Sequence, residues 1–136
     1  MSPKIQTAAI HHITLTVTDI RRSVDFYTTY LGFQKAMDLS ESRAVMANGN
    51  ALVALSEAPD PSRAIPGDKF DENRVGLDHV SFSVNSLAEL EAAAGVFDQD
   101  GIEHGEIKDL GADLAIYVMA FRDPDNTQLE LTASYS

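Results

Sequence analysis

Apolar and polar residues alternate in two segments of the chain that match each other without a gap. Residues 10–20 (IHHITLTVTDI) align with residues 77–87 (LDHVSFSVNSL), which begin 67 positions later. In both segments every second residue is apolar, which predicts a β-strand with one apolar and one polar face. His12 and His79 stand at the same place in the two copies, at the start of the polar face. The repeat therefore predicts two equivalent strands, each beginning with a histidine.

Each of these strands is followed by the signals of a helix. Asp19 can cap a helix whose apolar residues recur at helical spacing, and Gly32 follows as its terminator. In the second half, Ser86 and Glu89 form a capping box before another helical stripe. We therefore expect one helix after each of the two repeated strands.

Three further strands are expected after each helix. They are predicted over residues 33–39, 43–47 and 51–56 in the first half, and over 104–110, 114–121 and 127–132 in the second. Between the halves, a segment with several prolines and no hydrophobic period is typical of a linker.

Together these elements predict one α+β domain over residues 8–134. It would consist of two βαβββ modules, 8–58 and 76–134, joined by a linker over 59–75. The two sheets would form an open, curved mixed β-sheet barrel around a polar cleft. We expect the function to lie in that cleft.

Composition excludes several kinds of partner. The formal net charge of −11 argues against binding to nucleic acid or to an anionic membrane. No apolar run reaches the ~20 residues of a membrane span, and the first residues lack a signal-peptide core. The chain has no cysteine, so it has neither a disulfide framework nor a thiolate site. A cytoplasmic protein is therefore expected.

The third residue of interest is Glu130, in the middle of the last predicted strand between Leu129 and Leu131. A carboxylate at such a position is costly unless something neutralises it. A divalent cation held by His12, His79 and Glu130 would do so and would leave coordination positions open for water or substrate. The alternative is that the histidines are ordinary hydrogen-bonded or half-exposed strand residues and the glutamate is solvated. The residue pattern alone leaves both interpretations open.

The repeated segments, together with residues 31–33 (LGF), 123–126 (DPDN) and 129–131 (LEL), resemble the vicinal oxygen chelate superfamily. This superfamily includes glyoxalase I, extradiol dioxygenases, fosfomycin-resistance enzymes and bleomycin-binding proteins, and the resemblance covers nearly the whole chain. It implies paired βαβββ modules and metal ligands on the first strand of each module and the last strand of the second. Those positions are His12, His79 and Glu130. The resemblance also implies a homodimer, with the site either within one chain or shared between two.

One departure from the superfamily narrows the expected reaction. Glyoxalase I enzymes usually carry a further metal-binding glutamate on the fourth strand of the first module, where this chain has Ala54. Glu57, three residues later, has the opposite strand parity and is expected to be a solvated surface charge. A metal held by three protein ligands, with its other coordination positions open, is more similar to the sites of the iron(II) extradiol dioxygenases or the manganese-dependent fosfomycin enzymes. The resemblance thus favours Fe²⁺ as the cofactor, with Mn²⁺ or Zn²⁺ as alternatives.

We therefore predict a metal-dependent, dioxygenase- or lyase-like enzyme acting on a small oxygenated substrate. The alternative is a metal-free protein that binds and sequesters a drug or metabolite, as bleomycin-binding relatives do. No catalytic residue is assigned by the sequence. The spare candidates for proton handling are His11, which has the wrong strand parity to share a face with His12, and His104 and Tyr117, whose faces the sequence does not give.

Overall fold

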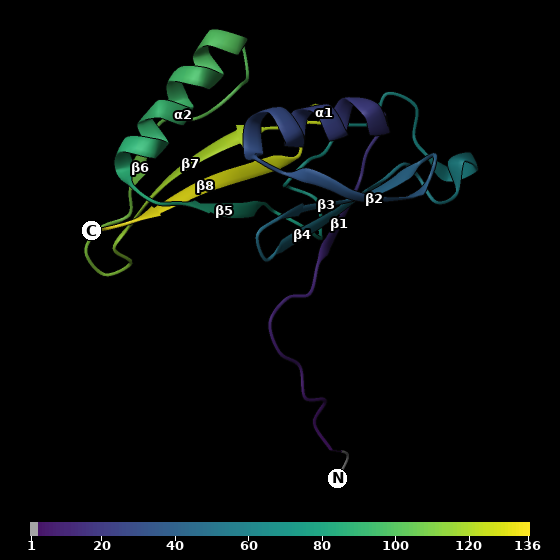
Figure 1. Ribbon diagram of the computed structural model, residues 1–136, viewed down its shortest axis with the longest axis horizontal. Helices are drawn as coiled ribbons and strands as arrows, with labels where there is room; N and C mark the ends of the chain where they lie inside the picture. Colours follow the sequence, from purple (N-terminus) through teal and green to yellow (C-terminus); the bar gives the residue numbers. More distant parts are fainter. Residues whose placement is uncertain (1–2) are drawn as a thin grey trace. The chain divides into compact units, whose positions relative to one another are not determined.

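The protein is described by a computed structural model that covers residues 3–136 (Figure 1). Its elements, in chain order, are β1 (Ile13–Thr16), α1 (Ile20–Leu31), β2 (Gln34–Ser40), β3 (Arg43–Asn48), β4 (Ala51–Ser56), the short 3₁₀ helix η1 (Pro61–Arg63), β5 (Val80–Val84), α2 (Leu87–Asp100), β6 (Lys108–Asp109), β7 (Ile116–Arg122) and β8 (Gln128–Ser134). The chain divides into two compact units, Met1–Ala64 and Ile65–Ser136. Each unit has the order βαβββ, so the predicted pair of modules is confirmed.

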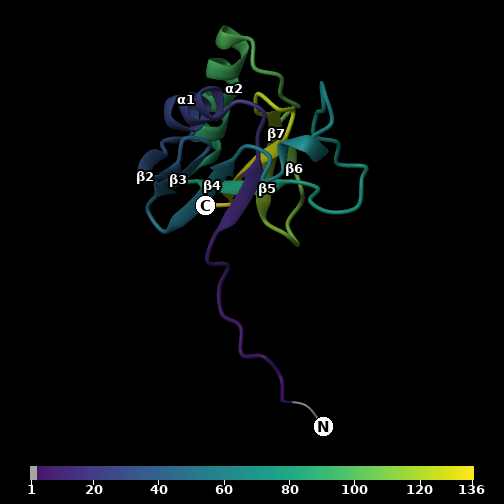
Figure 2. The ribbon, with the colours of Figure 1, turned by 90° about the vertical axis from the view of Figure 1, so that its right-hand side faces the viewer.

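The first unit is a four-stranded sheet with the order β1-β4-β3-β2. Strand β1 runs parallel to β4, and the other neighbours are antiparallel. Helix α1 packs on one face of this sheet (Figure 1). The apolar side chains buried in this unit are Leu15, Val17, Phe26, Tyr27, Phe33, Ala44, Met46, Val53, Ala54 and Leu55. Residues 3–12 lead away from β1 as an extended segment (Figure 2).

The second unit repeats this arrangement, with the strand order β5-β8-β7-β6. Strand β5 is parallel to β8, and α2 packs on β7 and β8. The apolar side chains buried in this unit are Val80, Leu90, Phe97, Val118, Met119, Phe121, Leu129, Leu131 and Ala133. The face away from α2, called the polar face below, carries Ser81, Ser83, Gln128, Glu130 and Thr132. Both sheets are open and mixed, which confirms the α+β class.

The predicted helix ends are confirmed by hydrogen bonds. The Asp19 side chain accepts the N–H of Arg22 at 3.1 Å, and the Ser86 hydroxyl accepts the N–H of Glu89 at 3.2 Å. These caps satisfy amide groups that have no partner within the helix. Gly32 ends α1 with φ of 71°, a left-handed conformation that favours glycine.

The strand predicted over residues 104–110 is largely wrong. Only Lys108–Asp109 forms a strand, and it is preceded by an isolated bridge between His104 and Phe121. Gly105 follows this bridge directly, and glycine weakens a strand because it has no side chain to pack against its neighbours. The other predicted strands agree with the structure to within two residues at each end.

Among residues 3–136, no helix is both long enough and apolar enough to cross a membrane.

Candidate metal site

Glu130 lies in the middle of β8 on the polar face of the second sheet. It pairs with Ser81 of β5 on one side and with Ala120 of β7 on the other. Its side chain is 20% exposed, and one carboxylate oxygen accepts a long hydrogen bond of 3.4 Å from the Thr132 hydroxyl. A carboxylate in this half-buried position has capacity for a further, positively charged partner.

His79 lies one residue before β5 and reaches toward this carboxylate. Its Nε2 atom is 3.6 Å from Oε1 of Glu130, which is longer than a normal hydrogen bond. Two ligands about 2.1 Å from one ion lie about 3.0–3.6 Å apart at ligand–metal–ligand angles of about 90–120°. An imidazole nitrogen and a carboxylate oxygen are also suitable donors for iron, manganese or zinc. The pair therefore fits part of a divalent metal site.

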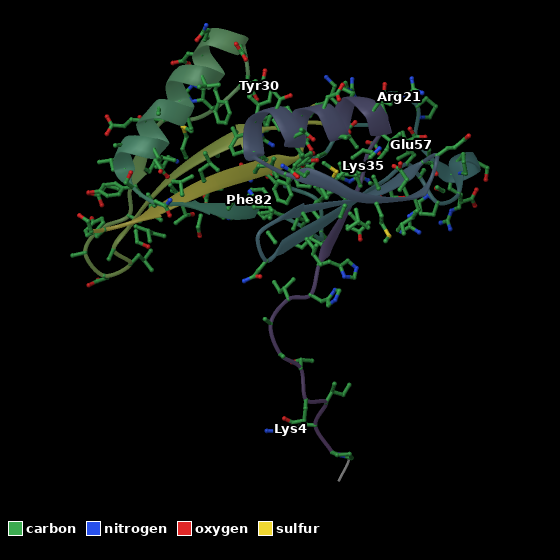
Figure 3. All side chains as sticks on the ribbon, in the orientation of Figure 1. Lys4, Arg21, Tyr30, Lys35, Glu57 and Phe82 are labelled. Atoms are coloured by element: carbon green, nitrogen blue, oxygen red, sulfur yellow. The ribbon has the colours of Figure 1, made fainter. Side chains whose placement is uncertain are left out.

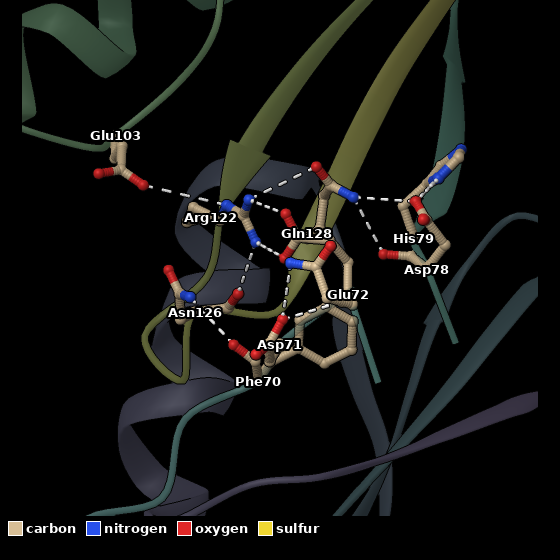
Figure 4. A network of polar contacts seen from close by, with 10 residues as sticks. Phe70, Asp71, Glu72, Asp78, His79, Glu103, Arg122, Asn126 and Gln128 are labelled. Carbon is tan, nitrogen blue, oxygen red and sulfur yellow. Dashed lines mark hydrogen bonds and ion pairs between the residues drawn. The ribbon is translucent and has the colours of Figure 1, made fainter. Parts of the chain in front are cut away.

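The other ring nitrogen of His79 is held by the preceding residue. His79 Nδ1 lies 2.8 Å from Oδ1 of Asp78, and Nε2 of Gln128 donates to the same carboxylate oxygen at 3.0 Å (Figure 4). If the neutral ring donates from Nδ1, the lone pair is on Nε2, on the side of Glu130. Metal-binding histidines are usually oriented by such a second hydrogen bond.

His12 belongs to the first unit, where it lies one residue before β1. Its Nδ1 is 2.8 Å from Nδ1 of His11, and the two rings meet edge to face. The expectation that strand parity separates these side chains is wrong, because both residues precede the first paired residue of β1, Ile13. In both units, therefore, the residue before the predicted ligand contacts its Nδ1 atom.

The predicted ligands are distributed over the two units. The second unit brings His79 and Glu130 together, and His12 is in the first. Over the part of the chain that the structure describes, no group of three or more His, Cys, Asp and Glu side chains is arranged to hold one ion. The set of His12, His79 and Glu130 stays a prediction.

His104 and Tyr117 lie on the face of the second sheet that α2 covers. Tyr117 pairs with the buried Ala133, and His104 pairs with the buried Phe121. Since paired residues share a face and neighbours along a strand alternate, both lie on the side opposite Glu130. The His104 ring instead contacts Asp98 near the end of α2, with Nε2 2.6 Å from Oδ1. This hydrogen bond raises the pKa of His104 above its usual value.

The fourth strand of the first unit provides no additional ligand. Ala54 lies in β4 between Thr14 and Val45, and its methyl group cannot bind a metal. Glu57 is not the solvated charge that the sequence predicts. Glu57 lies at the end of α1 that carries Arg21 (Figure 3). Its Oε2 atom accepts the N–H of Ile20, the first residue of α1, at 3.0 Å. Glu57 therefore caps a helix that begins 37 residues earlier in the chain.

A second polar feature, which the sequence did not reveal, joins the end of the linker to β7. The Arg122 guanidinium donates to both carboxylate oxygens of Glu72, at 2.9 and 2.7 Å (Figure 4). These hydrogen bonds, supported by the attraction between the charges, lower the pKa of Glu72 to about 2. Arg122 also donates to Oε1 of Gln128 at 3.5 Å, so this ion pair contacts the residue that holds Asp78.

Comparison with known proteins identifies the family. Residues 9–131 match the sequence model of the Glyoxalase/Bleomycin resistance protein/Dioxygenase superfamily, and the chain belongs to this family. The uncharacterized protein YwkD of Bacillus subtilis (strain 168) is 31% identical over 129 residues, which cover 90% of this chain and 94% of that protein. The metallothiol transferase FosB of Staphylococcus saprophyticus is 29% identical over 124 residues, covering 90% and 75% of the two chains.

The fold is likewise shared with a solved structure. The glyoxylase/bleomycin resistance protein/dioxygenase domain from Frankia sp. EAN1pec superposes with a TM-score of 0.80 at 28% identity, over 96% of this chain and 95% of that one. This family is the vicinal oxygen chelate superfamily that the sequence resembles.

Proposed function

We propose that this member of the superfamily is a metal-dependent enzyme in which His12, His79 and Glu130 hold one divalent cation. The observation that carries the proposal is the approach of His79 Nε2 to Glu130 Oε1, at 3.6 Å, on the polar face of the second sheet. The name of the relative FosB, a metallothiol transferase, supports a metal. We propose Fe²⁺ as the ion, with Mn²⁺ or Zn²⁺ as alternatives.

The substrate is proposed to be a small molecule that offers two neighbouring oxygen atoms. A bound divalent cation supplies Lewis acidity toward such oxygens. Around it the chain provides hydroxyl groups: Ser81 hydrogen-bonds Thr132, which in turn donates to Glu130. These groups can orient a polar substrate on the polar face. The acidic character of the whole chain, with a net charge of −11, disfavours a polyanionic substrate.

A dioxygenase- or lyase-like reaction with three protein ligands is favoured over a glyoxalase reaction with four. Ala54 cannot act as a ligand, and Glu57 is engaged at the start of α1. His104 and Tyr117 do not supply proton transfer at Glu130, because both lie on the opposite face of the sheet. Residues that handle protons in the reaction are therefore left unassigned.

The competing function is metal-free binding and sequestration of a drug or metabolite. It is favoured by one observation, that neither unit by itself gathers three metal-binding side chains within residues 3–136. Under this alternative, His79 and Glu130 would form a polar contact for the ligand.

We also propose that the protein is a homodimer that works in the cytoplasm and binds neither nucleic acid nor membrane. Because the three proposed ligands come from two units, the ion would lie either within one chain or between two. Light scattering at micromolar concentration tests the assembly, and the mass of a monomer would refute the homodimer.

Elemental analysis tests the metal directly. The full chain, purified without chelator and then reconstituted with Fe²⁺, Mn²⁺ or Zn²⁺, is expected to retain about one equivalent, and Glu130→Ala is expected to lose it. Glu91→Ala is the matched control, since Glu91 is exposed on α2, on the other side of the second sheet. A metal content below about a tenth of an equivalent in the reconstituted wild type would favour the metal-free binder instead.

A further inference from the structure

We infer that Asp78 and Gln128 are positioning residues that fix the ring of His79, so that its Nε2 atom is the one presented to Glu130. The pair is anchored through Arg122 to Glu72 at the end of the linker. The role of His79 as a metal ligand rests on the proposed function. The hydrogen-bond network from Glu72 to His79 does not depend on that function.

The first part of this network is the contact between His79 and Asp78. Oδ1 of Asp78 lies 2.8 Å from Nδ1 of His79, and a carboxylate can only accept this hydrogen bond. In the neutral ring the proton is therefore on Nδ1, and the lone pair is on Nε2. That tautomer allows Nε2 to coordinate a metal.

The second step explains what keeps the Asp78 carboxylate in place. The Asp78 side chain is 68% exposed, so a single hydrogen bond would not hold it against competition from water. The Gln128 amide donates from Nε2 to both the backbone oxygen and Oδ1 of Asp78, each at 3.0 Å (Figure 4). These two bonds fix the carboxylate relative to its own backbone.

The third step fixes the amide of Gln128. Its Oε1 accepts from Arg122 and its Nε2 donates to Asp78, so a cation and an anion select one orientation of the group. Arg122 is itself held by two short hydrogen bonds to Glu72, and both side chains are half-buried. A bidentate pair of this kind has a well-defined geometry.

Within residues 3–64 the first unit has no such support. Thr14 and Ser81 are equivalent in the repeat, and the strand register then places Leu52 at the position of Gln128. Ala47, which pairs with Leu52, corresponds in the same way to Arg122. The Nδ1 atom of His12 contacts Nδ1 of the neighbouring His11 instead of a carboxylate. The network is thus specific to the second unit, where Glu130 also lies.

The inference is tested in the metal-free full chain by the ¹⁵N shifts of the His79 ring. The spectra are recorded at an alkaline pH of about 9. The wild type is expected to show the form protonated on Nδ1. Asp78→Ala and Gln128→Met should both give a mixture of tautomers, whereas Gln34→Met, the same substitution on exposed strand β2, should not.

Metal affinity gives a second measurement, with Mn²⁺ alone as the probe. Asp78→Ala and Gln128→Met are expected to weaken Mn²⁺ binding by about 10–100-fold, and Gln34→Met by less than about twofold. A wild-type tautomer and wild-type affinity in Gln128→Met would overturn the inference. Wild-type protein that binds none of Mn²⁺, Zn²⁺ or Fe²⁺ would instead refute the proposed function, and the ¹⁵N shifts would still decide whether the pair positions His79.

Discussion

Removing the Glu57 side chain should destabilise the protein, although the residue follows the end of β4 and lies next to a linker. The carboxylate accepts the N–H of Ile20 at 3.0 Å, and Asp19 caps the same helix end by accepting from Arg22. The two acidic groups thus satisfy different amides of the first turn of α1. Glu57→Ala leaves the Ile20 amide without this partner in a partly buried place.

The size of the effect follows from what is lost. A side chain that caps a helix N-terminus contributes about 0.5–2 kcal/mol. A negative charge near that end adds about 0.3–1 kcal/mol through the helix dipole. We expect Glu57→Ala to lower the free energy of unfolding by about 1–2 kcal/mol. Glu57→Gln keeps a hydrogen-bond acceptor but removes the charge, so it should lower the free energy of unfolding by only about 0.3–1 kcal/mol.

Urea-induced unfolding followed by circular dichroism measures both variants. Glu41→Ala, an exposed glutamate in the turn between β2 and β3, is the control and should change stability by less than about 0.5 kcal/mol. If Glu57→Ala behaves like this control, the carboxylate is solvated, as the sequence suggested, and the cap contributes nothing measurable.

Three further predictions concern the second unit. The Arg122 hydrogen bonds lower the pKa of Glu72 to about 2, so this pair should stabilise the protein above pH 4.5, the usual pKa, and lose that contribution as the pH falls from 4.5 toward 2. In acid unfolding, Glu72→Gln should therefore lose less stability over this pH range than the wild type. The pKa of His104 is raised, so its pH dependence runs the other way. Its contact with Asp98 should contribute fully to stability below pH 6.5, and this contribution should be lost as the pH rises through the higher folded-state pKa. The stability difference between wild type and His104→Ala, measured by thermal unfolding, should be smaller at pH 9 than at pH 6, and a constant difference would count against this assignment. Leu129→Ala, at a fully buried position of β8, should cost about 2–5 kcal/mol in urea unfolding, and a loss below about 1 kcal/mol would contradict its place in the core.

The sequence predicted those features that depend on local pattern. Alternation gave the strands and the face on which Glu130 lies, and the caps at Asp19 and Ser86 gave the helix starts. These signals are local because a strand's period and a helix cap are set within a few residues. The strand that was predicted too long contains Gly105, where an otherwise suitable segment has no side chain to support pairing.

The contacts that were missed join residues far apart in the chain. Glu57 and Ile20 are 37 positions apart, and Arg122 and Glu72 are 50 apart. Gln128 was correctly placed on the polar face, but its contact with Asp78 depends on which residue of β5 pairs with which residue of β8. Alternation gives the face of a side chain, and only the register between strands gives its partner.

The position of the two histidines has a consequence for how an ion could enter. His12 and His79 each lie one residue outside the paired part of a strand that is at the edge of its own sheet, β1 or β5. Such ends open locally at far lower free energy than the core. Loading and release would therefore need only fraying of a strand end, without global unfolding. Under the proposed function, amide hydrogen exchange should be fast at these ends in the free protein and slower when a divalent cation is bound.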